Sequence, residues 1–330
     1  MSSTISITLL LLLATLSTQA DELTTTLRLI PEYHQAESRS RQELEARYQK
    51  GGFNVLATGV MDTQFDNEVI LNELYYDTVI ANQEMSFGKK IMSWGVGYGY
   101  RPLDVLEQED RRLLYSPTLE GVPLIAWDYF SEGGSAFTLA YINPLGGQDN
   151  DRLDQESLAL KYYGLWDNTD IHAVARFSRQ NKLETGIGFI HIINENLEWH
   201  GSALYQHRYY KRLTSKPFDK GINAILGLSW THSNGTSLLG EFWFDNAANQ
   251  QNLLLRLSND GDSVDTALDW LYTPQDGGWM LTASIKHERN RQKLELGVRT
   301  FGGSADSAFR AGLDDFVVYL SWEIAFVLGK

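Results

Sequence analysis

Hydrophobic and polar residues alternate one by one along most of the chain. Between residues 315 and 327, one face carries Phe316, Val318, Leu320, Trp322, Ile324 and Phe326, and the other carries Val317, Tyr319, Ser321, Glu323 and Ala325. Successive side chains of a β-strand point to opposite faces, so this period of two predicts a strand with one apolar and one more polar face. The same alternation recurs at 196–208, 221–231 and 293–300.

About eighteen such runs can be placed, each near the roughly 9 to 11 residues that a tilted membrane strand needs. They lie at 23–33, 41–49, 53–63, 69–79, 84–93, 121–130, 135–143, 156–165, 170–179, 182–192, 196–209, 221–231, 236–246, 251–258, 264–273, 277–288, 292–301 and 315–327. The pattern predicts an all-β protein, a transmembrane antiparallel up-and-down β-barrel of about 16–18 strands. On this assignment Leu320 faces lipid and Glu323 faces the lumen.

The connections between these runs form two sets that interleave. The short, Gly- and Asn-rich set is Lys50–Gly52, Glu132–Gly134, Asn194–Asn196, Ser233–Gly235 and Arg289–Arg291, and the long set is Trp94–Glu120, Pro144–Gln155, Lys211–Lys220 and Gly302–Asp314. Outer-membrane barrels have short periplasmic turns and longer extracellular loops, which this order matches. The alternatives are a soluble β-sandwich, which rarely needs so many consecutive hairpins, and a β-helix, whose fixed short repeat is not found.

The N-terminus has the pattern of an export signal. An apolar run of about a dozen residues, Ile5–Leu16, is too short to span a bilayer as a helix, which needs about 20. The small residues at Thr18 and Ala20 resemble a cleavage site, although no Lys or Arg precedes the apolar run. We expect a signal peptide at 1–20 and one barrel domain at 21–330. The alternative is a buried N-terminal helix or a short anchor.

Composition narrows the class of protein. The chain of 330 residues has a net charge of −14, which argues against nucleic-acid binding because that needs a basic footprint. Cysteine is absent, as suits transit through an oxidising periplasm. The 9 Trp and 16 Tyr suit aromatic girdles at the two membrane interfaces. We therefore expect location in the cell outer membrane, with the lipid bilayer, lipopolysaccharide and small hydrophilic solutes as partners, and a homo-oligomer as an option.

Three short segments carry a more specific likeness. They are Asn72–Asp77, then Phe87-Gly88-Lys89-Lys90, then Trp94-Gly95. With the export signal and the meander, they resemble the Gram-negative outer-membrane porin superfamily, including polysaccharide-export-type barrels, in which a Gly-Arg/Lys-Gln strand ends in Trp-Gly and enters a long loop. Lys90 stands where Gln is commoner, and Phe326 is followed by four residues where such barrels usually end in an aromatic residue.

The longest connection, Trp94–Glu120, mixes aromatic residues with both signs of charge. Its candidate pore-constriction residues are Tyr98, Tyr100, Arg101, Asp104, Glu107, Arg111 and Arg112. The resemblance implies that this loop folds inward and narrows the pore, where charges of both signs would filter solutes by charge and size. Deleting Val105–Ser116 should then raise conductance, and neutralising Arg111 and Arg112 should shift selectivity toward cations. The alternative is an exposed loop with solvated charges.

The faces assigned to the lumen are rich in charge, with 12 acidic and 9 basic residues. They are Arg28, Glu43, Glu45, Arg47, Glu73, Asp77, Lys90, Lys161, Arg176, Glu184, Glu198, Arg208, Glu241, Asp245, Arg256, Asp265, Asp269, Lys286, Glu295, Arg299 and Glu323. Our candidate lumen residues are Glu73, Asp77, Lys90, Arg176, Glu241, Arg256 and Arg299. The count leans slightly toward cations. The alternative is cross-strand pairs that only stiffen the wall.

Motifs for other chemistry are weak. The tetrad His232–Gly235 is similar to the motif of outer-membrane phospholipases, but their His and Ser are two apart on one strand face, whereas here they are adjacent. His200 and His207 differ in parity, so no metal site is suggested, and Gly95–Tyr100 fits no nucleotide-binding pattern. We expect no catalytic residue and no cofactor. The predicted function is passive diffusion of small hydrophilic solutes. The alternatives are a dedicated saccharide or solute export or uptake barrel, and a plugged barrel with an enzymatic or structural role.

Overall fold

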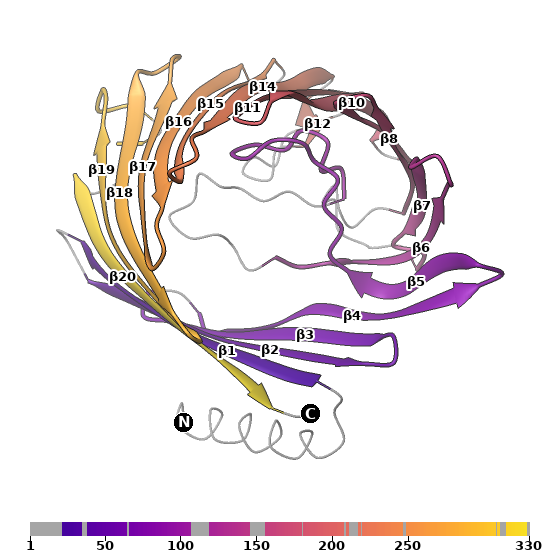
Figure 1. The fold of residues 1–330 in the computed structure, drawn as a ribbon, viewed down its shortest axis with the longest axis horizontal. Helices are drawn as coiled ribbons and strands as arrows, with labels where there is room; N and C mark the ends of the chain where they lie inside the picture. Colours follow the sequence, from indigo (N-terminus) through magenta and orange to yellow (C-terminus); the bar gives the residue numbers. More distant parts are fainter. Residues whose placement is uncertain are drawn as a thin grey trace.

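The computed structural model shows a large antiparallel sheet that closes on itself (Figure 1). It describes residues 22–34, 38–64, 66–106, 119–145, 156–179, 181–207, 209–210, 217–218, 220–246, 249–307, 309–310 and 315–328. The sheet has 18 strands, each paired with its neighbours in the chain, and β1 also pairs with β20. The predicted up-and-down barrel is therefore confirmed. No described residue belongs to a helix long and apolar enough to cross a membrane.

Each of the eighteen predicted runs is a barrel strand, and the ends differ by a few residues. The strands are β1 Glu22–His34, β2 Arg39–Lys50, β3 Phe53–Asp62, β4 Glu68–Ile80, β5 Gln83–Lys90, β6 Val122–Phe130, β7 Ala136–Ile142, β8 Ser157–Trp166, β9 Thr169–Ser178, β10 Lys182–Asn194, β11 Leu197–Gln206, β14 Gly221–Thr231, β15 Thr236–Asp245, β16 Gln250–Asp260, β17 Val264–Thr273, β18 Gly278–Arg289, β19 Gln292–Gly302 and β20 Phe316–Leu328. A further two-residue pair, β12 Tyr209–Tyr210 and β13 Pro217–Phe218, lies between β11 and β14.

The two rims of the barrel differ in the length of their connections. On the rim where β1 begins and β20 ends, every turn is short, from two residues at 51–52 to five at 131–135. Ala81, Asn82 and Asn290 have positive φ there, because such turns match the right-handed twist of the flanking strands. The opposite rim carries the long connections, although the connection at 179–181 is tight, as its sequence indicates.

Side chains alternate between the outer face and the lumen as the period of two predicts. On β20, Leu320 points outward and is 37% exposed, whereas Val317 is buried and faces inward. Glu323 accepts hydrogen bonds from Arg28 Nε and Nη2 at 3.0 and 2.8 Å, across the seam that closes the barrel. The assigned parity of the last strand therefore holds.

This parity predicts unequal effects of charge on the two faces. Leu320→Arg should destabilise the barrel by up to about 2–4 kcal/mol, the range for arginine at the bilayer midplane, and by less if the site lies nearer the interface. Glu323→Gln should cost less, because its neighbours remain hydrated in the lumen. Urea titration of refolding into lipid vesicles would measure both free energies of unfolding. Equal losses at the two positions would contradict the assignment of faces.

Candidate functional site

The described residues of the connection between β5 and β6 lie inside the barrel (Figure 1). We call its described residues, 91–106 and 119–121, the inward loop. A register shift between β3 and β4 places two successive β4 side chains, Asn72 and Glu73, toward the lumen, where both are buried. Asn72 Nδ2 donates to Leu119 O at 2.7 Å, and Glu73 accepts from Ile91 N at 3.1 Å. The bulge thus ties down both ends of the inward loop.

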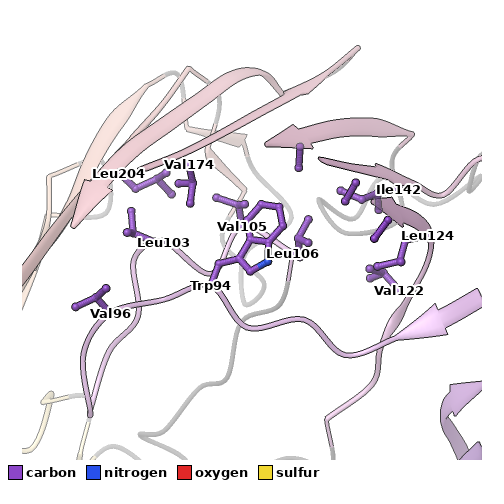
Figure 2. Packing of buried hydrophobic residues seen from close by; sticks show 13 residues of the cluster. Trp94, Val96, Leu103, Val105, Leu106, Val122, Leu124, Ile142, Val174 and Leu204 are labelled. Carbon is purple, nitrogen blue, oxygen red and sulfur yellow. The ribbon is translucent and has the colours of Figure 1, made fainter. Parts of the chain in front are cut away.

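Five apolar residues of the inward loop, which we call its base, pack on an apolar part of the inner wall (Figure 2). The base is Trp94, Val96, Leu103, Val105 and Leu106. The apolar wall patch beneath it is Val122, Leu124, Ala126, Ala140, Ile142, Ala159, Val174 and Leu204, from β6, β7, β8, β9 and β11. None of these side chains is more than 8% exposed, so water is excluded between loop and wall. Burial of apolar area holds the base in place.

Glycines in β10 make room for the base. A Cβ atom at Gly186 would lie 2.6 Å from Leu103 Cδ2, and one at Gly188 would lie 2.9 Å from Leu103 Cδ1. Both distances are far inside van der Waals contact, so side chains here would push Leu103 off the wall. These two inward positions therefore serve the packing of the inward loop, which the sequence pattern alone did not reveal.

A buried charged pair supports the base from below. Arg176 and Glu184 are each 1% exposed, and their closest atoms, Arg176 Nη1 and Glu184 Oε2, are 3.5 Å apart. Arg176 Nη1 also donates to Val105 O at 2.8 Å, and Gln206 Nε2 donates to Glu184 Oε1 at 2.7 Å. Arg176 was a candidate lumen residue, and the structure places it on the inner wall but under the inward loop.

Two candidate constriction residues, Asp104 and Arg101, make their contacts within the loop itself. Asp104 is 3% exposed and accepts hydrogen bonds from Ser93 Oγ at 3.0 Å, from Gly95 N at 2.5 Å and from Trp94 N. Burial raises the pKa of the Asp104 carboxyl, and these donors oppose that rise. Arg101 donates from Nε to Gly97 O at 3.2 Å. These hydrogen bonds of Asp104 and Arg101 stabilise the conformation of the inward loop.

The tip of the inward loop, residues 97–100, reaches across the lumen toward β11 and β15. Tyr98 donates its hydroxyl to Glu198 Oε1 at 2.8 Å. Burial, followed by this bond to a carboxylate, raises the pKa of Tyr98 to about 12, so the phenol stays protonated as the donor. Tyr100 stacks on Trp243 with ring centroids 4.4 Å apart and planes 9° from parallel. The tip is held by polar and aromatic contacts.

Beside the tip lies a cavity of about 540 Å³, which we call the charged cavity. Its walls are the tip and the inward faces of β1, β2 and β16–β20, with the ionisable residues Arg28, Glu32, Glu43, Tyr98, Tyr100, Arg256, Asp269, Glu295, Arg299 and Tyr319. Gly297 of β19 lies opposite Tyr319 of β20, and a Cβ there would collide with the tyrosine ring. Tyr319, which the sequence did not single out, thus lies flat on the wall over a glycine.

Arginine and carboxylate side chains pair along the charged cavity. Arg256 Nε and Nη2 donate to the two oxygens of Asp269 at 2.6 and 2.8 Å. Arg28 Nη1 donates to Glu43 Oε2 at 2.6 Å, and Arg28 also binds Glu323. The arginines are the more exposed partners: 44% for the Arg256 side chain against 24% for Asp269, and 36% for Arg28 against 6% for Glu43.

The structure therefore divides the candidate site residues into groups. Tyr98, Tyr100, Arg256 and Arg299 line the charged cavity. Glu73, Arg176 and Glu241 are buried in contacts with the inward loop. Asp77 and Lys90 form an ion pair of 2.9 Å on neighbouring strands. Glu107, Arg111 and Arg112 lie outside the described residues, as does most of the segment 105–116.

The structure also bears on the weaker motifs. His232–Gly235 forms the turn between β14 and β15, where His232 Nδ1 contacts Asn234 Oδ1 at 3.0 Å and Gly235 N bonds to His232 O. The tetrad is a hairpin turn, as predicted. Among the described residues, no cluster of His, Cys, Asp or Glu is arranged to hold a metal ion.

Comparisons with known proteins identify a shared fold but do not assign the chain to a family. No family model and no curated protein matches the chain. Among solved structures, the Pseudomonas aeruginosa protein OccD3 (OpdP) aligns with a TM-score of 0.61 at 11% identity, covering 93% of this chain and 91% of that one. Acinetobacter baumannii OccAB1 gives 0.61 at 8% identity, covering 93% and 96%. Wzi of Escherichia coli, described as an outer membrane protein involved in group 1 capsule assembly and a carbohydrate-binding β-barrel, gives 0.63 at 11% identity, covering 95% and 86%.

Proposed function

We propose that this chain is an outer-membrane channel through which small hydrophilic solutes diffuse passively along the charged cavity. The observation that carries the proposal is the division of the lumen: the inward loop covers the apolar wall patch, and a polar cavity of about 540 Å³ remains beside the tip. The barrel fold shared with outer-membrane proteins supports this location. A water-filled path lined by hydrated charges is what small polar solutes need to cross a bilayer.

The charges along this path are mixed. Arg28 and Arg256, the exposed arginines of the cavity, each have a carboxylate partner at hydrogen-bond distance, so the wall is charged but locally balanced. Such a wall attracts polar solutes of either sign and gives no strong net field. We therefore expect selection chiefly by size, through the bore between Tyr98, Tyr100 and the facing wall, with weak selection by charge.

Conductance measurements test the channel directly. Purified protein added to a planar bilayer should give discrete current steps, and proteoliposomes should swell in small neutral solutes but not in large ones. Heat-modifiable mobility in detergent gels would show that the barrel is folded. A folded barrel that passes neither ions nor small solutes would refute the channel and favour the plugged alternative.

Neutralising the two partners of one cavity pair should shift ion selectivity in opposite directions. Arg256→Gln should move the reversal potential in a salt gradient toward cation preference, because it leaves the Asp269 charge uncompensated at the wall. Asp269→Asn should move it toward anions for the converse reason. The double variant should return close to the parent. If neither single variant moves the reversal potential, solutes do not pass this part of the wall.

A second candidate, saccharide binding in the same cavity, has a specific observation in its favour. Tyr98, Tyr100 and Tyr319 line the cavity together with carboxylates and arginines, and aromatic faces beside charged hydrogen-bonding groups suit sugar rings. Wzi, which shares the fold, is described as carbohydrate-binding. Adding defined oligosaccharides to the conductance measurement separates the two functions: reversible block of the current at low concentration indicates a binding site, and its absence indicates a simple channel.

A further inference from the structure

The base and the tip of the inward loop are held by different forces. The base is buried on the apolar wall patch, whereas the tip makes polar contacts to β11 and β15 and the stack of Tyr100 on Trp243. Gly97, the first residue of the tip, has a φ of +124°, a backbone conformation that favours glycine. Because the tip borders the charged cavity, the contacts that hold the tip in position also determine the width of the bore.

One carboxylate, Glu241 of β15, holds the backbone of the tip. Tyr98 N donates to Glu241 Oε1 and Gly99 N donates to Glu241 Oε2, both at 2.6 Å. His200 Nε2 of β11 lies 2.9 Å from Glu241 Oε1. The Glu241 side chain is fully buried, and its charge is met by these donors. Hydrogen bonds to an ionised acceptor are about twice as strong as neutral ones.

The sequence builds space for this arrangement at two glycines. His200, Gly227 and Glu241 lie side by side on β11, β14 and β15, so His200 and Glu241 meet across a strand that has no side chain there. A Cβ at Gly227 would lie 2.9 Å from Glu241 Cγ, and a Cβ at Gly99 would lie 2.7 Å from Glu241 Oε2. Only glycine at both positions lets the tip, the carboxylate and the imidazole come together.

We propose that Glu241 is a positioning residue that sets the bore of the channel by holding the tip of the inward loop, and that it does not act as a filter through its own charge. The inference rests on the proposed function, since it takes the charged cavity as the solute path. It separates Glu241 from Asp269, which is also a carboxylate on the inner wall but borders the cavity and is partly exposed.

Glu241→Gln keeps the size of the side chain and removes one acceptor, so that an amide NH₂ faces a backbone N–H. The amides of Tyr98 and Gly99 should then exchange with deuterium about 10- to 100-fold faster, the factor expected for a lost hydrogen bond to a charged group. The channel should admit larger polyethylene glycols and show more open-channel noise, with little change in reversal potential. Gly99→Ala, which pushes the tip off Glu241 from the loop side, should give the same result if Glu241→Gln does not fold.

Asp269→Asn is the matched control, because it should shift the reversal potential and leave polymer exclusion and exchange at the tip unchanged. If Glu241→Gln leaves the exclusion limit of a conducting barrel unchanged, or mainly shifts its reversal potential, the positioning role is wrong. If the parent barrel does not conduct, the proposed function fails by itself, and amide exchange still decides whether Glu241 holds the tip: unchanged exchange in Glu241→Gln overturns the inference.

Discussion

A barrel in which residues 96–106 are replaced by an equally long Gly-Ser segment should remain closed and conduct severalfold more current than the parent. The change removes the tip that borders the charged cavity and most of the base, while β5 and β6 stay joined. Ion current rises with the cross-section of the path, and the region over the apolar wall patch would be added to it. Single-channel recording in planar bilayers measures the increase.

A control variant distinguishes a wider bore from a general loss of barrel stability. The double variant Tyr98→Ala, Tyr100→Ala trims only the cavity side of the tip and should raise conductance by a smaller factor. The Gly-Ser variant should also be less stable, because the wall patch at Leu124, Ile142 and Leu204 becomes wet. Unchanged conductance in a folded Gly-Ser variant would mean that the inward loop is not the constriction and that the wall residues or another loop limit the flow.

The variant Arg176→Met should destabilise the barrel strongly, by about 3–5 kcal/mol, the cost typical of breaking a buried ion pair. It removes the cation 3.5 Å from Glu184 in a site where both side chains are 1% exposed, and it removes the donor to Val105 O in the inward loop. A carboxylate left in such a site loses most of the interactions that compensate its dehydration. Denaturant titration of refolding in vesicles gives the free energy.

The matched control is the double variant Arg176→Met, Glu184→Gln. Removing both charges leaves no buried ion, and Gln206 can still donate to the new amide oxygen, so the double variant should recover much of the lost stability. Arg256→Gln, which breaks a pair whose arginine is 44% exposed, should cost far less. A double variant as unstable as Arg176→Met would show that the arginine acts through packing and its bond to Val105, and not through the charge of Glu184.

The barrel could be predicted from the sequence because each of its strands is a local pattern. An outward Leu320 and an inward Glu323 differ in parity within one strand, and the apolar outer face and more polar lumen of the barrel repeat that parity. Turn residues such as Asn82 and Asn290 are equally local signals. Strand number and faces therefore follow from pairs of residues close together in the chain.

The division of the lumen could not be predicted in the same way, because it depends on contacts between distant segments. Counting inward charges treats Glu184, Glu241 and Asp269 alike, yet the structure buries the first two in contacts around the inward loop and leaves the third on the cavity. A partial signal existed in the inward apolar residues of β6, such as Val122 and Leu124. Apolar side chains are not expected on an inner wall that faces only water. Their presence on β6 could therefore have indicated a segment that covers this part of the wall.

The seam between β1 and β20 has a consequence for how the protein folds. Arg28 and Glu323, which bond across it, are 295 residues apart in the chain, so the last pairing needs the whole sequence to be present. Every other neighbouring pair of barrel strands forms through a local connection and can assemble earlier. Until the ends meet, the unfinished sheet has two edges with unpaired N–H and C=O groups, which favour aggregation and which a membrane interior cannot satisfy. For a barrel in the proposed outer-membrane location, we therefore expect insertion to require closure. Removal of β1 or β20 should then destabilise the entire wall and not one strand.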